Sequence, residues 1–254
     1  MTPPTGDGPL TDDVQARHRE RIWEAMRAVA RPDSRFHWDF SSFIADFEGS
    51  DRCAESIRQL DTYRSAERIF ITPDNSTEVL RRVAMADGKA FVMSTYGIRR
   101  GFLILNPADV PPAERSYAAT LDGMDRYGRP VDMAALARWG HIGLLVTGGS
   151  AVSTNGVRFG KGHGYFDLEW ALLCEIGCAD ATSEIVDVVH DCQVVDEPLQ
   201  GADHDVPVDW IVTPTRTLPV HNVRREIGRV RWEMLAGTEL ATIPPILELQ
   251  ARQA

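Results

Sequence analysis

A glycine-rich stretch at residues 154–170, TNGVRFGKGHGYFDLEW, holds the residue types of this chain best suited to chemistry. Its glycines, cations and carboxylate follow one another closely: Gly156, Arg158, Gly160, Lys161, Gly162, Gly164 and Asp167. Glycine loses much conformational freedom on folding, so such a run indicates a sharp turn or a close approach of the backbone to another group. Two interpretations follow, a loop that joins a strand to a helix or a cradle for phosphate.

The stretch fits neither of two common phosphate-binding motifs. Lys161 is followed by Gly162 rather than by Ser or Thr, as a P-loop requires, and the glycine spacing is GxGxG instead of GxGxxG. The physics still suits a polyphosphate, because successive backbone N–H groups, Arg158, Lys161 and a helix N-terminus all attract anions. Asp167 can hold a magnesium ion against the same phosphates.

Lys161 is also unusual for this chain. The sequence has 27 lysines and arginines, and all except Lys89 and Lys161 are arginines. A lysine provides a compact ammonium where arginine provides a planar fork. This difference indicates that Lys161 has a specific role in the glycine-rich stretch.

Two His-Asp pairs, His190–Asp191 and His204–Asp205, lie near predicted strand ends. Metal ligation is one interpretation, and the alternative for His190 is a hydrogen bond to a backbone carbonyl that stabilises a turn. Asp205 is the better candidate for a divalent ion, because a carboxylate oxygen is a hard ligand. The aromatic residues of 36–47 fit loop packing or the binding of a flat ligand.

Alternating segments of strand and helix surround these motifs. The pattern predicts helices over 12–31, 52–66, 75–87, 131–139, 165–177 and 224–236, and strands over 68–72, 90–95, 101–106, 141–149, 184–195 and 209–215. Residues 107–130 read as a loop, and the two prolines at 244–245 as a break. We therefore expect an α/β fold with a doubly wound, mostly parallel open sheet and helices on both faces, a three-layer α/β/α arrangement. Ligands bind such sheets beyond the carboxyl ends of the strands.

Composition narrows the class of protein. With 254 residues, we expect a disordered leader over 1–11 and a single domain over 12–254. The net charge of −10 argues against binding of nucleic acid. No apolar run reaches the ~20 residues of a membrane helix, and no signal peptide is visible, so we expect a cytoplasmic protein. The four cysteines form no CxxC pair and are expected to be reduced thiols.

At GVRFGKGHGYFDLEW the sequence resembles the 5-formyltetrahydrofolate cyclo-ligase family, also called methenyltetrahydrofolate synthetases. The family signature looks like G-x-R-x-G-x-G-x-G-Y-x-D, and this chain fills every fixed place, ending with Tyr165 and Asp167. The continuation DLEW, with RERIWEAM and HDVPVDWIVTPTR, is similar to a divergent branch of methenyltetrahydrofolate-synthetase-domain-containing proteins and their prokaryotic relatives.

The resemblance implies a compact α/β/α fold that uses ATP and magnesium. It implies that the formyl oxygen of 5-formyltetrahydrofolate attacks the γ-phosphate, that a second substrate nitrogen closes the ring to 5,10-methenyltetrahydrofolate, and that phosphate leaves. Positioning and charge neutralisation dominate catalysis of phosphoryl transfer. A small folate-like molecule is thus the expected partner, and the protein is expected to be a monomer or a homodimer.

The resemblance also assigns roles to residues. The implied catalytic residues are Arg158, Lys161 and Tyr165. The implied ATP-binding residues are Arg19, Gly156, Arg158, Gly160, Lys161, Gly162, Gly164 and Tyr165. The implied substrate-binding residues are Asn75, Glu78, Met93, Tyr96 and Tyr165, and the implied magnesium ligands are Asp167 and Asp205.

The chain departs from the family at one position. Family members usually carry a lysine four residues before an arginine near the N-terminus, and aligning RERIW places these at Gln15 and Arg19. Two alternatives therefore stand beside folate cyclisation. One is ATP-dependent activation of another formamide or carboxamide, and the other is a non-catalytic module that binds a nucleotide or another ligand.

Overall fold

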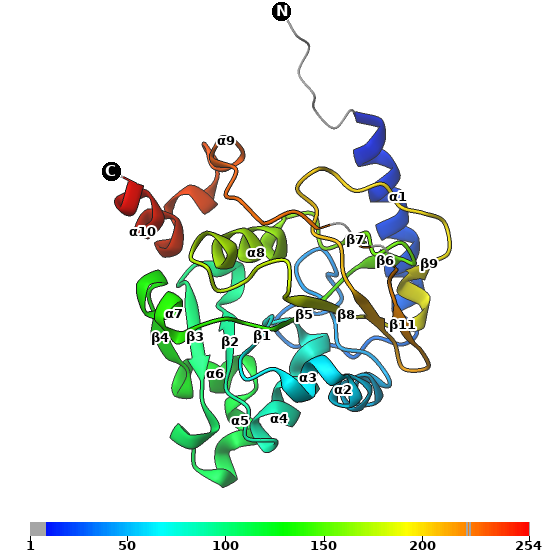
Figure 1. Ribbon diagram of the computed structural model, residues 1–254. Helices are drawn as coiled ribbons and strands as arrows, with labels where there is room; N and C mark the ends of the chain where they lie inside the picture. The colour runs from blue at the N-terminus through cyan, green and yellow to red at the C-terminus, as the bar shows by residue number, and fades with distance from the viewer. Residues whose placement is uncertain (1–8, 222, 224, 254) are drawn as a thin grey trace, which may run out of the picture.

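The computed structural model describes residues 9–221, 223 and 225–253, and it is built around one eight-stranded sheet (Figure 1). The strand order is β11-β10-β8-β5-β1-β2-β3-β4. The strands are β1 Ile69–Ile71, β2 Phe91–Ser94, β3 Phe102–Leu105, β4 Arg129–Val131, β5 Leu144–Gly148, β8 Glu184–Val188, β10 Trp210–Val212 and β11 Thr217–Pro219. The five strands from β10 to β2 are parallel to one another. At one end of the sheet β11 is antiparallel to β10, and at the other end β3 is antiparallel to both β2 and β4.

The central strands are apolar on both faces, as expected for strands covered by helices on both sides. In β1, Ile69 and Ile71 pack into one core and Phe70 into the other. In β5, Leu145 belongs with Phe70, because alternate residues of a strand point to opposite faces. The predicted three-layer α/β/α architecture is therefore confirmed.

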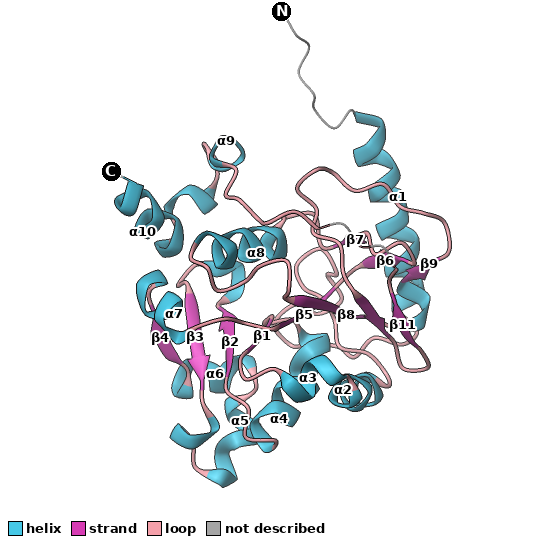
Figure 2. Ribbon diagram, in the orientation of Figure 1, coloured by secondary structure: helices cyan, strands magenta, loops and turns pink. Residues whose placement is uncertain are grey.

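Helices cover both faces of the sheet (Figure 2). The helices are α1 Pro9–Met26, α2 Ser50–Gln59, α3 Asp61–Ser65, α4 Glu78–Ala86, α5 Arg115–Ala118, α6 Leu121–Tyr127, α7 Met133–Trp139, α8 Tyr165–Glu175, α9 Trp232–Leu235 and α10 Pro244–Gln253. Buried side chains of α1 to α4 join one core, and those of α7, α8 and α10 join the other. Within the described residues, no helix is both long and apolar enough to cross a membrane.

A second, three-stranded sheet holds the beginning of the glycine-rich stretch. It consists of β6 Ala151–Ser153, β7 Arg158–Phe159 and β9 Val194–Val195, in the order β7-β6-β9. The hairpin of β6 and β7 leads into the glycines, and α8 begins directly after them at Tyr165. The most flexible part of the stretch is thus anchored at both ends.

Some predicted elements are wrong. Residues 107–130 contain α5, α6 and the start of β4 instead of a loop, since their short helical segments are too brief to give a periodic pattern. The helix predicted over 224–236 is only α9, and the two prolines at 244–245 begin α10 rather than end a helix, as proline at a first helical turn allows. Helix α1 begins at Pro9, inside the predicted leader, whose residues 1–8 lie outside the described part of the chain.

Candidate functional site

A cavity of about 230 Å³ lies at the carboxyl ends of the central strands. It is bordered by Thr72 to Asn75 after β1, by Ser94 and Tyr96 at the end of β2 and by Thr147 at the end of β5. From β1 the chain moves outward to β2 on one side and returns to β5 on the other. The cavity therefore occupies the switch point at which doubly wound folds bind ligands.

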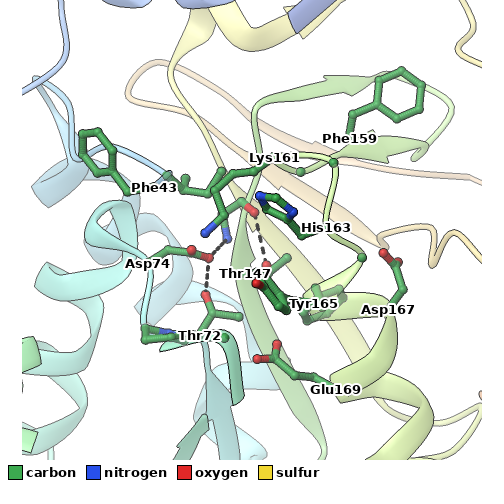
Figure 3. A pocket seen from close by; sticks show the side chains of 18 of the residues that line it. Phe43, Thr72, Asp74, Thr147, Phe159, Lys161, His163, Tyr165, Asp167 and Glu169 are labelled. Carbon is green, nitrogen blue, oxygen red and sulfur yellow. Dashed lines mark hydrogen bonds between the residues drawn. The ribbon is translucent and has the colours of Figure 1, made fainter. Parts of the chain in front are cut away.

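The glycine-rich stretch forms one wall of this cavity, with residues 158–167 lining it without a break (Figure 3). Gly162 and Gly164 have positive φ angles of 98° and 63°, a backbone conformation that glycine adopts at little cost. A Cβ atom added to Gly162 would lie 3.9 Å from the guanidinium of Arg19 on α1, so this cation also reaches the loop. Gly164 is the N-cap residue of α8, and no side chain forms a capping hydrogen bond at this end of the helix. The first N–H groups of this 11-residue helix are therefore suited to an anion.

Lys161 is held between two tyrosines of the cavity. Its Nζ lies 5.2 Å from the ring centre of Tyr96 and 5.5 Å from that of Tyr165. The same ammonium donates a 3.5 Å hydrogen bond to the carbonyl of Ser42, which also accepts a bond from the Tyr96 hydroxyl. These contacts place the ammonium at the junction between the glycine loop and the aromatic side of the cavity.

The two predicted magnesium ligands lie on the same side of the cavity. Asp167 accepts a 2.9 Å hydrogen bond from the Val206 N–H and lies 3.7 Å from the guanidinium of Arg158. Asp205 accepts a 2.8 Å hydrogen bond from the Ala202 N–H. Burial raises the pKa of Asp205, and the nearby charge of Asp167 adds to the rise. The described residues contain no cluster of three or more potential ligands, so a cation here would take at most two carboxylates. Magnesium commonly binds in this way, completed by phosphate and water, so the two residues fit it.

Aromatic rings form the opposite wall. Phe36 stacks on Phe43 at 5.1 Å and on Tyr96 at 5.5 Å, measured between ring centres, and all three line the cavity. Asn75 lies in the same region, where its amide donates a 2.7 Å hydrogen bond to Asp33. This wall offers flat apolar surface beside a polar edge, a combination that suits a planar heterocycle.

Three of the predicted site residues lie outside the cavity. Gly156 forms the turn between β6 and β7, where its N–H donates to Ser153 and its φ angle is 87°. Met93 is fully buried in the core, because its side chain points to the other face of β2 from Ser94. Glu78 pairs with Arg82 along α4 at 2.6 Å. These three residues do not line the cavity, whereas every other residue assigned through the resemblance does.

Sequence reasoning assigned Asn75 in the loop after β1 but missed the contacts of Asp74 and Arg81 that hold this loop. Asp74 accepts hydrogen bonds of 2.6 Å from the Thr72 hydroxyl and 3.1 Å from the N–H of Gly148, which joins the ends of β1 and β5 (Figure 3). The fully buried Arg81 donates to the carbonyls of both Thr72 and Asp74, and burial lowers its pKa to about 10. No motif marks Arg81, since an arginine on a helix normally lies at the surface.

A group of buried polar side chains beneath α8 was also missed. Glu169, 3% exposed, lines the cavity and accepts a short hydrogen bond from the Ser94 hydroxyl. Burial raises the pKa of Glu169 to about 8. Asp187 of β8 lies opposite Thr147 of β5, and burial raises the pKa of its completely covered carboxyl to about 7. For Asp187 the signal in the sequence was an acidic residue in the middle of an apolar run, IVDVV.

The His190–Asp191 pair lies apart from the cavity. The His190 ring accepts a 3.2 Å hydrogen bond from the Cys192 N–H and so caps a short 3₁₀ turn. His190 thus stabilises a turn, as the structural interpretation expects, but its partner is a backbone N–H and not a carbonyl. Asp191 binds the hydroxyls of Thr213 and Thr215, each at 2.6 Å. All four cysteines of the chain are free.

Comparison with known proteins agrees with the signature at the glycine loop. The sequence profile of the 5-formyltetrahydrofolate cyclo-ligase family matches residues 12–214. The chain belongs to this family. The match contains both walls of the cavity and ends before β11, α9 and α10.

Curated relatives carry the name methenyltetrahydrofolate synthase domain-containing protein. The human protein is 31% identical to this chain over 240 residues, which cover 92% of this chain and 61% of the human protein. The zebrafish protein is 29% identical over 235 residues, which cover 91% of this chain and 60% of the zebrafish protein. This chain thus spans about three-fifths of the length of these relatives. The NMR structure of 5,10-methenyltetrahydrofolate synthetase from Aquifex aeolicus superimposes with a TM-score of 0.50 at 15% identity, covering 83% of this chain and 95% of that one, so the fold is shared.

Proposed function

We propose that this protein is an ATP- and magnesium-dependent cyclo-ligase that converts 5-formyltetrahydrofolate to 5,10-methenyltetrahydrofolate. The observation that carries the proposal is one cavity in which the family signature from Arg158 to Asp167 faces a wall of stacked aromatic rings. A bound ATP would supply the phosphoryl group that makes the formyl oxygen a leaving group, and magnesium would neutralise its phosphates.

The cationic wall has the features that phosphate binding needs. Arg158, Lys161 and the uncapped N-terminus of α8 converge on the glycine loop, and fixed positive groups stabilise transferring phosphates without reorganising. Asp167 and Asp205 would hold the cation at the far end of the same wall. Their neighbouring carboxylates repel each other, and a divalent ion would relieve that repulsion.

The aromatic wall would bind the pterin-like ring of the substrate. A ring stacked near Phe36 and Tyr96 would lie beside Lys161, so that the formyl group could face the phosphate side. Tyr165, the first residue of α8, lines the cavity next to Lys161 and would orient the reacting groups. Such positioning of two reactants can account for a large part of a catalytic rate enhancement.

The test is direct. Purified protein incubated with ATP, magnesium and 5-formyltetrahydrofolate should form the methenyl chromophore together with equimolar ADP. Lys161→Met should abolish both signals, whereas Lys89→Met, at a lysine bound to the Ala66 carbonyl outside the cavity, should retain them. Absence of chromophore and ADP from the unmodified protein would refute the proposal.

A second candidate function is ATP-dependent activation of another formamide or carboxamide. The observation that favours it is Gln15, which stands where the family usually carries a lysine. This candidate predicts binding of ATP with no turnover of 5-formyltetrahydrofolate. A competition experiment with a panel of formamides, with ADP release as the signal, separates the two functions.

A further inference from the structure

Asn75 has a carbonyl oxygen that no other side chain uses. Its amide nitrogen donates a 2.7 Å hydrogen bond to Asp33, whereas its Oδ1 makes no hydrogen bond to any residue that the structure describes. The side chain is half-buried, and Oδ1 is not sealed inside the protein. Because Asn75 lines the cavity beside the aromatic wall, this oxygen is available to accept a hydrogen bond from a ligand.

The orientation of the Asn75 amide follows from the charge of its neighbour. An ionised carboxylate only accepts hydrogen bonds, so the amide NH₂ group must face Asp33 and the carbonyl oxygen must face away from it. Hydrogen bonds from the side chain and backbone of Arg35, with the one from Asn75, hold the pKa of Asp33 well below its usual range against the effect of burial. Asp33 is therefore ionised at neutral pH.

Arg35 holds Asp33 in place. Oδ1 of Asp33 accepts hydrogen bonds of 2.7 Å from the Arg35 backbone N–H and 2.9 Å from Arg35 Nε, and Oδ2 accepts one of 2.5 Å from the Arg35 guanidinium. The backbone carbonyl of Asp33 accepts a 2.7 Å hydrogen bond from the His37 N–H. The side chain of Asp33 is only 9% exposed. These contacts close a turn over residues 33–37 and fix the carboxylate against which Asn75 rests.

The same turn carries one ring of the aromatic wall. Phe36 follows Arg35 directly, and the Arg35 guanidinium lies 5.9 Å from the centre of its ring. Phe36 and Asn75 both line the cavity. The turn therefore positions a flat apolar surface and a hydrogen-bond acceptor together. A heterocycle against this wall would meet the acceptor with a group on its edge, where the reduced pterin ring of a folate carries N–H donors.

We propose that Asp33, fixed by Arg35, is a positioning residue that holds the Asn75 amide with its carbonyl oxygen free to accept a hydrogen bond from an N–H group on the edge of the ligand ring. The chemical class of ligand is a planar heterocycle with an N–H donor. The inference rests on the proposed function in taking 5-formyltetrahydrofolate as that ligand. Asp33 itself is not among the residues that line the cavity, so it acts through Asn75.

Three variants and one control separate positioning from a general structural role. Asn75→Leu removes the acceptor. Asp33→Asn keeps the shape but lets the two amides pair in either sense, so that the Asn75 carbonyl can turn away from the ligand. The third variant combines both changes. Asp122→Asn is the matched control, because Asp122 is the other carboxylate near the Arg35 guanidinium, at 3.6 Å, and its side chain is 76% exposed.

The first measurement uses the ligand-free protein. The side-chain amide resonances of Asn75 are identified in a proton–nitrogen correlation spectrum by their loss in Asn75→Leu. They should shift in Asp33→Asn, where the acceptor is no longer charged, and stay in place in Asp122→Asn. Unmoved resonances in Asp33→Asn would show that Asp33 does not hold this amide, which refutes the proposal.

The second measurement is the affinity for 5-formyltetrahydrofolate and, separately, for ATP. Asn75→Leu should weaken binding of the folate by about 10-fold and Asp33→Asn by about 3- to 10-fold, since a hydrogen bond is lost or misdirected. The affinity of both variants for ATP should stay within about 2-fold of the native protein, because the phosphate side is untouched. The double variant should match Asn75→Leu within about 2-fold, because Asp33 has no effect once Asn75 is gone. Asp122→Asn should bind both ligands with native affinity.

Two results would refute the proposal while the proposed function stands. One is unchanged affinity of Asn75→Leu for the folate, which would remove the acceptor role. The other is an additive loss in the double variant, or an equal loss of ATP affinity in Asp33→Asn, which would show that Asp33 only supports the fold. If the native protein does not bind this folate, the proposed function fails, and the amide spectrum alone decides whether Asp33 positions Asn75.

Discussion

The buried carboxyl group of Asp187 makes a quantitative prediction about stability. The side chain is 0% exposed, and neither oxygen makes a hydrogen bond of normal geometry within the described part of the chain. Burial, opposed in part by the charge of Arg158, raises its pKa from 3.8 to about 7. A raised pKa in an acid favours the protonated native state, so the resulting destabilisation is absent below about pH 3.8 and grows as the pH rises toward 7.

The loss of stability can be calculated from the difference between the native and unfolded pKa values of Asp187. One pKa unit corresponds to about 1.4 kcal/mol, so at pH 7 the native state loses about 4 kcal/mol relative to the unfolded chain. Asp187→Asn keeps the shape and is neutral at every pH. Because its amide also lacks partners, we expect it to recover only about 2 kcal/mol of this free energy at neutral pH, roughly 4–8 °C in Tm.

Urea unfolding of the native protein and of Asp187→Asn from about pH 4 to pH 8 measures this difference. The variant should be about 1–2 kcal/mol less stable than the native protein near pH 4, where the carboxyl group of Asp187 is still neutral, and about 2 kcal/mol more stable near pH 7, so the two curves should cross between these pH values. Asp109→Asn, at an exposed position, should follow the native curve. A variant that is less stable at pH 7, or a gain of equal size at every pH, would show that Asp187 is ionised and satisfied in the fold.

Three further substitutions test the site and its support. Lys161→Met should weaken binding of ATP by about 10- to 100-fold in a calorimetric titration, since a charge-assisted hydrogen bond to phosphate is lost. An affinity within about 2-fold of the native protein would contradict the proposal that Lys161 binds phosphate. Gly156→Ala should lower Tm, because the new Cβ would lie 2.9 Å from a backbone carbonyl at a φ angle of 87°. The folded variant should still bind ATP with native affinity. A loss of ATP affinity at unchanged Tm would show that Gly156 contacts the ligand. Arg81→Met should reduce the free energy of unfolding by about 3 kcal/mol, since it removes the hydrogen bonds that Arg81 donates to the carbonyls of Thr72, Asp74 and Ala119. An unchanged urea midpoint would show that these bonds do not stabilise the fold.

The fold and the glycine-rich loop of the candidate site were visible in the sequence, because each depends on a local pattern. Continuous apolar runs such as HIGLLVTGG predict buried parallel strands, and the glycine spacing identifies the loop before α8. Asp167 and Tyr165 follow that loop directly, so their placement required only the start of a helix.

The remaining features depend on contacts between distant segments. The bond of Ser94 to Glu169 joins β2 to α8, and Arg81 binds carbonyls that it meets only after folding. Met93 was assigned to the site although its neighbour Ser94 is the residue that faces the cavity. A shift of one residue in a strand reverses the face of the sheet, and sequence alone does not fix that register.

The position of the cavity between β1 and β5 affects the stage of folding at which a binding site can form. These two strands pair directly, Ile69 with Leu144 and Ile71 with Val146, although they lie in different halves of the chain. Such non-local pairing forms late, because a long loop must close first. Neither wall can complete a binding site before that pairing exists, so a ligand recognises only the finished central sheet. Ligand binding should therefore stabilise the whole domain and distinguish native molecules from partly folded ones.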